Sequence, residues 1–573
     1  MRALSTVLLC CATALASAQS PDFAPTFGTN GVQLITFPIG GEALTCVPLA
    51  DGKLLLSGAG YDGNANSYHA GFAIIDTVCG ALDTTFGVNG VVEIIHEQRT
   101  FGQSAAVQPD GAIIGCGMIA PSNAGSQQWP GLFRLNADGT VDNTFNGTGY
   151  VRFPFNGVGG FDGSAGDLTA VFVNPDSTIL CTGAAFDALI GAFRFNYDGS
   201  PDTSYGVDGA ARMQLPGFSY SGRGTGLLLA DSSVLVVTPT WTGSDVVIAI
   251  AKFDPFGEPD TTFGSDGLVV SSVSTYSAEI GMAVQTDGRI LVSTSGAGDE
   301  GFHMARFMPN GDLDLSYGTN GVSAVPGNFG GSPLRGRKMQ LLPDGSTLQF
   351  GRVQGQNPVM LKRDANGNAV SGFGTDGFLM AYINDGNGYF IDGLVLPSGD
   401  VIAYGLSYPA YYLATKLTYD PAANALPVIT ANGTLLSTTG AGSFQWSLDG
   451  DEISGATGST YEPTENGTYT VTMTVSPECS YTSAPFALLN VGLSEVAGTK
   501  LRIMENPVTE ILAVQNDGAA MPYELLTMAG QHIAGGMLRS GRNDIGMSGL
   551  AGGVYLLRTN AAEGTRTHQI IKQ

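Results

Sequence analysis

An internal repeat constrains this chain more than any other feature of its sequence. A short turn that ends on an aromatic residue, usually followed by glycine, recurs seven times in the first 420 residues, as in Asp83-Thr84-Thr85-Phe86-Gly87. The seven aromatic positions, separated by 54 to 60 residues, are Phe27, Phe86, Phe145, Tyr205, Phe263, Tyr317 and Phe373. A fixed period of this size indicates a supersecondary unit that buries its apolar face only against its neighbours.

A second motif lies between each pair of aromatic residues. It takes the form Asp-Gly in four copies, at Asp51, Asp110, Asp287 and Asp344, with apolar alternation on both sides. Asp-Gly in this setting predicts a tight β-hairpin. A third strand is expected over residues 131–135 of the second repeat, and a fourth follows each aromatic turn.

Four short strands per repeat predict a seven-bladed β-propeller over residues 21–421. The first repeat begins at its aromatic turn, without a third strand, and the last stops after residues 413–418. One blade is therefore expected to be assembled from both ends of this region, which would close the ring and leave no long strand edge unpaired.

Composition supports an all-β protein. Glycine supplies 82 of 573 residues and charged residues only 13 %, while hydrophobic residues reach 43 %. Such a chain has enough apolar surface to fold but lacks the usual helix formers. The net charge of −25 disfavours nucleic acid and anionic membranes as partners, whereas neutral ligands such as glycans remain compatible.

The N-terminus predicts export. Met1-Arg2 precedes an apolar run that ends at Ala16-Ser17-Ala18, which is typical of a secretory signal peptide over residues 1–18 with cleavage between Ala18 and Gln19. No other segment is apolar for long enough to predict a transmembrane segment.

Beyond the signal peptide, the cysteines are Cys46, Cys79, Cys116, Cys181 and Cys479. A pair among the first four is one option, and no spacing among the five suggests zinc.

The pattern changes after about residue 426. A tryptophan at position 446 and a Gly-Thr-Tyr-Thr-Val segment at 467–471 predict a small immunoglobulin-like β-sandwich over residues 426–491. The segment resembles bacterial modules that carry Gln-Trp and Gly-Thr-Tyr-x-Val at these places. Cys479 has no cysteine partner within it.

Residues 495–573 form a third predicted domain, also a β-sandwich. An Asn-Pro step, a Gly-Gln turn, a Gly-Val-Tyr strand and a basic terminal strand follow one another, with motif positions Asn506, Pro507, Gly530, Gly553, Val554, Tyr555 and Lys572. This order resembles the C-terminal sorting domain of type IX secretion cargo in Bacteroidota. The resemblance implies handling by the type IX machinery and its sortase, removal of the domain, and release or attachment to surface lipopolysaccharide.

The Asp-x-Thr-Phe-Gly turns, with their period near 60, resemble the delta-60 repeat of secreted bacterial β-propeller proteins. The resemblance covers about 400 residues and implies the fold rather than an activity. A secreted or outer cell-surface location agrees with both resemblances.

No catalytic, metal or cofactor site is predicted. The five histidines lack the spacing of zinc ligands, and no G-x-S-x-G or phosphate-binding loop is present. Carboxylates repeated at turns are typical of Asx turns and hairpins. The repeated aromatic residues are expected to pack between blades.

The irregular loops of the predicted propeller all fall on one face, which makes that face the candidate contact surface. Residues 335–338 are assigned to these loops. Aromatic and polar side chains there suit sugar stacking or protein contact, and the candidate ligand-binding residues are Tyr61, Asp62, Tyr68, Trp129, Tyr220, Trp241, Asp245 and Tyr408.

We therefore hypothesise a non-enzymatic, monomeric binding or adhesion protein that takes a glycan or a protein, without a cofactor. Two alternatives stay open. One is a propeller-based carbohydrate hydrolase or lyase that uses Asp62, Asp162 or Asp245, and the other is a structural matrix component.

Overall fold

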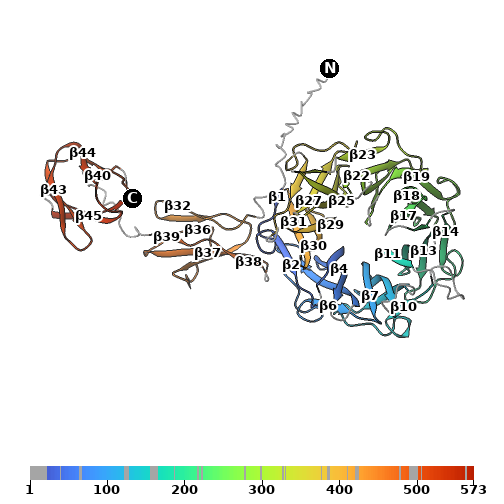
Figure 1. Ribbon diagram of the computed structural model, residues 1–573. Helices are drawn as coiled ribbons and strands as arrows, with labels where there is room; N and C mark the ends of the chain where they lie inside the picture. Colours follow the sequence, from blue (N-terminus) through green and yellow to red (C-terminus); the bar gives the residue numbers. More distant parts are fainter. Residues whose placement is uncertain are drawn as a thin grey trace, which may run out of the picture. The chain divides into compact units, whose positions relative to one another are not determined.

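The computed structural model is built almost entirely of β-strands (Figure 1). It describes residues 22–573 apart from 39, 63–66, 122–127, 155–165, 186–187, 216–218, 221–223, 276–278, 297–299, 326–327, 330, 356, 376, 384–386, 410, 420–424, 477–478, 489–500, 505 and 562–563. Over these residues the only helical element is the short 3-10 turn η1 (Phe145–Gly147). No helix of the described chain is long and apolar enough to cross a membrane. The predicted all-β class is confirmed.

The described strand ladders of the first 420 residues form five sheets, which divide into antiparallel units of four main strands. The blade count of seven stays a prediction. The first three units are β3 (Glu42–Pro48), β4 (Lys53–Asp62), β5 (Ser67–Asp76) and β6 (Val91–Ile94); β7 (Arg99–Val107), β8 (Ile113–Ala120), β9 (Trp129–Leu135) and β10 (Tyr150–Arg152); and β11 (Gly166–Val173), β12 (Ile179–Ala185), β13 (Leu189–Phe195) and β14 (Ala210–Gln214).

The next three are β16 (Thr225–Leu228), β17 (Val234–Trp241), β18 (Val246–Phe253) and β19 (Leu268–Ser274), with β15 (Ser219–Tyr220) on β17; β20 (Gly281–Val284), β21 (Ile290–Gly296), β22 (Glu300–Phe307) and β23 (Val322–Val325); and β25 (Ser332–Leu341), β26 (Thr347–Val353), β27 (Pro358–Arg363) and β28 (Phe378–Met380), with β24 (Asn328–Phe329) on β25. In Figure 1 these units surround a central opening, with β6, β10, β14 and β19 at the outside of the ring.

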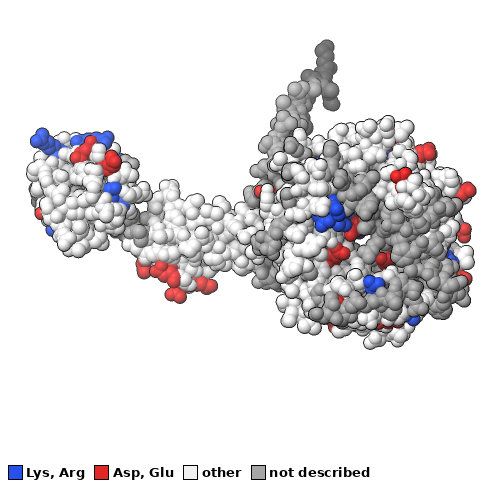
Figure 2. Space-filling view, in the orientation of Figure 1, with Lys and Arg blue, Asp and Glu red and all other residues white. Residues whose placement is uncertain are grey.

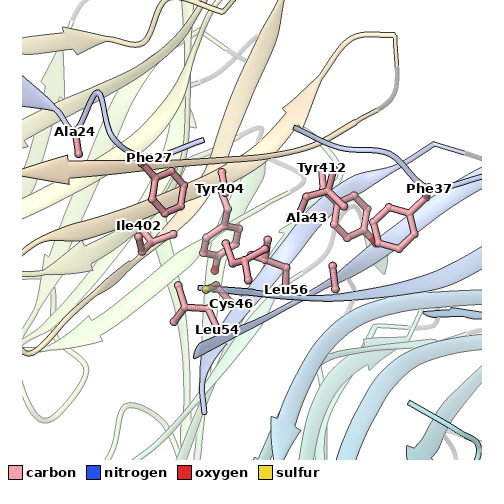
Figure 3. Packing of buried hydrophobic residues seen from close by; sticks show 14 residues of the cluster. Ala24, Phe27, Phe37, Ala43, Cys46, Leu54, Leu56, Ile402, Tyr404 and Tyr412 are labelled. Carbon is pink, nitrogen blue, oxygen red and sulfur yellow. The ribbon is translucent and has the colours of Figure 1, made fainter. Parts of the chain in front are cut away.

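Both ends of the propeller region build the last unit, as predicted. The strands β29 (Gly388–Val395), β30 (Val401–Ser407) and β31 (Tyr411–Thr418) are completed by β2 (Val32–Ile35), which pairs with β31, as does β1 (Asp22–Phe23). A buried cluster around this junction joins Phe27 from the start of the chain to Ile402, Tyr404 and Tyr412 from its last blade (Figure 3). The ring is therefore closed by pairing and by packing.

Neighbouring blades are held together at the repeated aromatic residue. All seven of these side chains are at most 2 % exposed. In blade after blade the ring lies against a glycine of the next repeat; a Cβ on Gly199 would come within 2.8 Å of the Phe145 ring, and one on Gly367 within 2.7 Å of the Tyr317 ring. The residue after the aromatic also donates its N–H to that same turn, as Gly87 does to the Asp138 carbonyl at 2.9 Å. Only glycine leaves room for this contact.

The repeated aspartate of the aromatic turn is a structural group. Asp142 accepts hydrogen bonds from the Thr144 backbone and hydroxyl, and its other oxygen lies 2.7 Å from Arg134 Nε. Arg134 also donates to the Tyr197 carbonyl of the next repeat and lies 4.8 Å from the centroid of the Phe145 ring. The same arrangement recurs around Arg194 and Arg306. The turn interpretation of these carboxylates therefore agrees with their geometry.

The middle of the chain forms two small sheets. One contains β32 (Ile429–Asn432), β33 (Leu435–Thr438) and β36 (Thr460–Tyr461), and the other contains β34 (Ser443–Leu448), β35 (Asp451–Glu452), β37 (Gly467–Ser476), β38 (Cys479–Thr482) and β39 (Phe486–Leu488). Trp446 is fully buried and donates from Nε1 to the Gly458 carbonyl at 2.9 Å. The immunoglobulin-like assignment and the predicted domain boundaries stay predictions.

The cysteine pairing differs from the pair considered within the first four cysteines. Cys79 of the propeller and Cys479 of β38 form a disulfide across 400 positions of sequence, whereas Cys46, Cys116 and Cys181 are free and buried. Tyr481, also on β38, donates its hydroxyl to the Thr26 carbonyl. Spacing could not reveal this pairing, because the two cysteines belong to segments predicted as separate domains.

The last strands form a separate two-sheet unit with its own core. One sheet contains β40 (Leu501–Ile503), β41 (Ile511–Asn516) and β44 (Gly541–Gly546), and the other contains β42 (Met521–Thr527), β43 (His532–Leu538), β45 (Gly553–Ala561) and β46 (Gly564–Lys572). Leu512, Val514, Leu525, Leu557 and Ile570 are fully buried between them. The predicted β-sandwich is confirmed.

We expect Gly257→Ala to destabilise the propeller more than Gly52→Ala does. Both glycines have a positive φ, +85° and +83°, so both substitutions incur about 1–2 kcal/mol of backbone strain. Only at Gly257 would the new Cβ meet the neighbouring blade, 2.7 Å from the Gly206 nitrogen and 3.0 Å from the Tyr205 ring. Overpacking of this kind adds about 1–3 kcal/mol. Chemical unfolding of both variants measures the difference, and equal losses would contradict the inter-blade contact.

We also expect the propeller to lose stability as the pH falls from 4 to 2. The Lys252 ammonium, together with the Thr262 hydroxyl, lowers the pKa of Asp260 from 3.8 to about 2. A carboxyl whose folded pKa is lowered stabilises the fold above its unfolded pKa, and this contribution is lost as the pH falls through the folded pKa. Thermal unfolding between pH 2 and 6 should show a shallower acid decline in Asp260→Asn. An unchanged decline would show that this ion pair does not contribute.

Candidate functional site: the centre of the irregular face

The antiparallel order of each blade separates its connections onto two faces. The first–second and third–fourth connections lie at one end of the strands; the second–third connections and the crossovers between blades lie at the other. We call the second end the irregular face. The first strand of each blade therefore begins on this face. First strands of neighbouring blades contact one another around the axis of the ring, and we call the area at their starts the mouth.

A group of charged and aromatic side chains meets there, which we call the mouth cluster: Glu42, Glu279, Arg337, Arg352 and Tyr389. Tyr389, on β29, donates its hydroxyl to Glu42 Oε2 at 2.5 Å. The guanidinium carbons of Arg337 and Arg352 lie 4.4 and 5.4 Å from the centroid of the Tyr389 ring. Arg337 also forms an ion pair with Glu279. Three blades and one crossover thus contribute to a single cluster.

Burial governs the electrostatics of this cluster. It raises the pKa of Tyr389 far above its usual value, and the neighbouring Glu42 carboxylate acts in the same direction. Burial likewise lowers the pKa of the Arg337 guanidinium, an effect that Tyr389 and Glu42 oppose. Tyr389 is therefore a neutral phenol near pH 7, fit to donate a hydrogen bond and to present a ring, and unsuited to act as a base.

β-Bulges shape the first strands where they approach the mouth. Among the described ladders, five of the seven first strands shift register near this end, at Ala43/Thr45, Gly102/Ser104, Leu168/Ala170, Gly336/Met339 and Phe390/Asp392. A bulge places an extra residue in the strand and changes the direction of its side chains. The insertion between Gly336 and Met339 carries Arg337 itself.

A second group adjoins the mouth cluster on the first two blades. The Arg99 guanidinium lies 4.5 Å from the centroid of the Tyr68 ring, which in turn lies 4.9 Å from the Tyr61 ring and 5.6 Å from the Phe101 ring. Phe101 and Tyr389 share one buried apolar cluster, against which Tyr68 packs. The two groups therefore form a continuous surface, which we call the arginine–tyrosine surface.

An open groove of about 490 Å³ continues this surface toward the rim of the propeller. Its lining residues are Ser67, Ile95, Glu97, Gln98 and Pro121. Ser67 and Gln98 are the chain neighbours of Tyr68 and Arg99. Glu97 pairs with Arg152 at 2.6 Å, and Arg152 lies 5.5 Å from the centroid of the Trp129 ring. Basic and acidic side chains near the middle of the propeller face are visible in Figure 2.

The structure brings some of the predicted residues together. Tyr61 and Tyr68 belong to the arginine–tyrosine surface, and the Tyr408 ring lies 6.4 Å from the Tyr389 ring. The Trp129 ring lies beside Arg152, which pairs with the groove residue Glu97. Tyr61 and Tyr408 are 47 % and 38 % exposed, which leaves ring area available to a ligand.

The remaining predicted residues lie elsewhere or outside the description. Trp241 and Asp245 flank the β17–β18 connection of the fourth blade, and no described contact joins either to the mouth cluster. Asp62 ends β4 in the first blade, with two blades between it and Asp245. Tyr220 is in β15, and its backbone pairs with that of Thr240 in β17. Asp162 and the predicted signal peptide with Ala18 and Gln19 lie outside the described residues.

Sequence reasoning missed most of the mouth cluster. Residues 335–338, predicted as part of an irregular loop, belong instead to strand β25, because the strand extends through its bulge. Glu42, Arg99 and Tyr389 were not predicted as site residues, because they lie at the start of strands. The available signal was a charged or aromatic residue at the first or second position of the innermost strand.

One group in the described chain has the composition of a metal site. Asp76, Cys79 and Cys479 offer ligand atoms within 4.8 Å of one another. The two sulfurs are joined in the disulfide, and Asp76 Oδ1 accepts the backbone N–H groups of residues 78 and 79. Because the sulfurs are bonded to each other and the Asp76 oxygen accepts two hydrogen bonds, this group does not form a metal site.

The order of motifs in the C-terminal unit also has a structural basis. The Asn506 side chain bonds to β46 twice, donating to the Gln569 carbonyl at 2.9 Å and accepting the Ile571 N–H at 2.8 Å. Gly553 and Val554 pair with Lys572 and Ile571. The Tyr555 hydroxyl donates to the Ala551 carbonyl, and Gly530 has the positive φ of a hairpin turn. Most motif positions thus hold the terminal strand in place.

Comparison with known families agrees with this architecture. Residues 108–145 and 285–317 match the family described as "Domain of unknown function (DUF5122) beta-propeller", and residues 503–573 match the "Secretion system C-terminal sorting domain". The chain is thus a β-propeller protein with a type IX sorting domain, which directs it to the cell surface or the extracellular space. No curated protein matches the chain.

Among solved structures, the chain is similar to a streptogramin B lyase (12 % identity, TM-score 0.37, covering 68 % of this chain and 97 % of the other). It is also similar to the polysaccharide lyase Uly1 (12 %, 0.39, 69 % and 93 %). A third likeness is to the β-propeller domain of the Trilobed protease from Pyrococcus furiosus (10 %, 0.34, 67 % and 95 %).

We expect Asn506→Ala to loosen the terminal strand. The variant loses both side-chain bonds to β46, worth together about 1–3 kcal/mol, and the Ile571 amide loses its acceptor. Hydrogen exchange on the full chain should show faster exchange at Ile571 than in the natural protein. Asn560→Ala, which removes only the exposed bond from Thr565, serves as the control and should leave Ile571 unchanged.

Proposed function

We propose that this exported propeller protein is a non-enzymatic binding or adhesion protein that holds a saccharide chain on its irregular face. The single observation that carries the proposal is the arginine–tyrosine surface, in which Tyr68 and Tyr389 lie beside guanidinium groups and Tyr61 packs against Tyr68. Aromatic rings offer apolar contact area to the faces of sugars, while the polar groups around them fix orientation. The open groove next to Tyr68 lengthens the surface beyond a single sugar.

The chemistry of the mouth cluster favours binding over hydrolysis. A glycoside hydrolase needs two carboxyl groups about 5–10 Å apart, one of them an acid and the other a base or nucleophile. In the mouth cluster Glu42 accepts the Tyr389 hydroxyl and Glu279 is paired with Arg337. Both carboxylates are thus engaged in supporting the cluster. A propeller carbohydrase or lyase stays the alternative, and a matrix component is a third.

Export fits the same role. We propose that the sortase of the type IX system removes the C-terminal domain, after which the propeller is released or attached to surface lipopolysaccharide. In either case the irregular face would meet extracellular polymers rather than cytoplasmic partners.

We expect Tyr61→Ala and Tyr408→Ala each to weaken saccharide binding by about 3- to 10-fold, because an aromatic contact contributes about 0.5–1.5 kcal/mol. Phe256→Ala is the matched control, since Phe256 is an exposed aromatic residue of a third–fourth strand turn on the opposite face. A glycan array probed with the full chain identifies the ligand, and titration with that ligand compares the variants.

Two outcomes would count against this proposal. Release of sugar products from an array polymer would favour the enzyme alternative. A binding loss in Phe256→Ala equal to that in Tyr61→Ala would show that the irregular face is not the binding surface.

A further inference from the structure

We infer that the ligand of the arginine–tyrosine surface is an acidic polysaccharide, recognised through its carboxylate or sulfate groups. This inference rests on the proposed saccharide-binding function and assigns its substrate class. It follows from the arginine side chains of the surface, from the atoms that they leave without a protein partner, and from the carboxylates that surround them.

Basic residues are scarce in this chain, and a group of arginines lies on this surface. The sequence contains 25 Lys and Arg against 50 Asp and Glu. Four of the 25 gather at or beside the mouth, namely Arg99, Arg335, Arg337 and Arg352. A protein with a net charge of −25 repels polyanions in general. A local group of arginines therefore indicates a specific anionic ligand.

Three of these arginines retain unused hydrogen-bond donors. The Nε atoms of Arg99, Arg337 and Arg352 are buried and have no protein acceptor in the described structure. Buried donors are normally paired, and an unpaired one is costly. Arg99 and Arg352 are partly exposed as whole residues, so a carboxylate or sulfate oxygen would bind at the exposed ends of their guanidinium groups with charge-assisted bonds, and the planar guanidinium matches such oxyanions in a bidentate manner. Neutral hydroxyls would leave much of this capacity unused.

The nearby carboxylates do not occupy these donors. Glu42 accepts the Tyr389 hydroxyl, Glu279 pairs with a terminal nitrogen of Arg337, and Glu97 pairs with Arg152. Asp167, at the start of β11, accepts the Gln103 amide at 3.1 Å. Each acid is thus held by a partner of its own.

The stacked arrangement also orients the arginines in advance. Arg99 lies over Tyr68, while Arg337 and Arg352 lie near the face of Tyr389. Side chains held in this way lose little further freedom when a ligand binds. The two tyrosines belong to one apolar cluster, so the charged groups stand along a common surface, as repeated anionic groups of a polymer require.

The test compares polymers of matched backbone and different charge. The full chain is titrated with polygalacturonate, its methyl-esterified neutral form, dextran sulfate and dextran, at two salt concentrations. We expect binding to one or both anionic polymers, weakened by salt, with little or no binding to the neutral forms. Polygalacturonate against dextran sulfate distinguishes carboxylate from sulfate recognition.

Variants locate the contact. Arg352→Gln and Arg99→Gln should each weaken anionic binding about tenfold or more, because a hydrogen bond to a charged group is worth about 1.5–3 kcal/mol. Arg352→Lys keeps the charge and the packing volume but loses the planar fork, so it should fold and still bind more weakly. Arg289→Gln is the matched control, since Arg289 lies beside Asp287 at a first–second strand turn on the opposite face.

The outcomes separate the two proposals. Equal binding of neutral and anionic polymers, or unchanged affinity in the Arg352 and Arg99 variants, would overturn the acidic class and leave saccharide binding standing. Binding of none of these polymers, together with an array without any saccharide ligand, would overturn both.

Discussion

The structure depends on one contact that is repeated around the ring: a buried aromatic side chain of one blade packed against a glycine in a turn of the next. The Phe145 ring against Gly199 and the Tyr317 ring against Gly367 are two of its copies. A backbone hydrogen bond from the residue after the ring joins the same two turns. Because the contact links neighbours rather than the two sheets of one core, each blade gains its apolar burial from the next. This explains why the aromatic and the glycine recur together in the sequence.

That contact also explains how much could be predicted. The repeat, its hairpin turns and the split blade could be predicted from the sequence, because each requires particular residues at set positions. An aromatic residue fills the space between blades, glycine occurs where φ is positive, and aspartate occurs where Thr144 or its equivalent needs a hydrogen-bond acceptor. The Cys79–Cys479 disulfide could not be predicted, since its partners are 400 positions apart and share no local pattern.

Only some residues of the candidate site could be predicted from the sequence, for a related reason. Exposed aromatic residues such as Tyr61, near the end of β4, and Tyr408, just after β30, were found because they break the turn pattern. Arg337 and Tyr389 sit on strands whose periodicity is disturbed by a bulge, and a bulge displaces the alternation by which inward and outward positions are told apart. Functional side chains at the start of inner strands therefore look like ordinary strand residues until the ring is assembled.

The shared last blade has a consequence for how the chain reaches its final form. Thr415 donates its hydroxyl to the Gly31 carbonyl, 384 positions earlier, and β2 pairs with β31 in the same place. Contacts between residues so distant in sequence form slowly, because a long loop must close first. The other blades can form in sequence order while β2 still lacks β31, the strand with which it pairs. A chain arrested before residue 411 would display two unpaired strand edges, and such edges are where β-proteins associate wrongly.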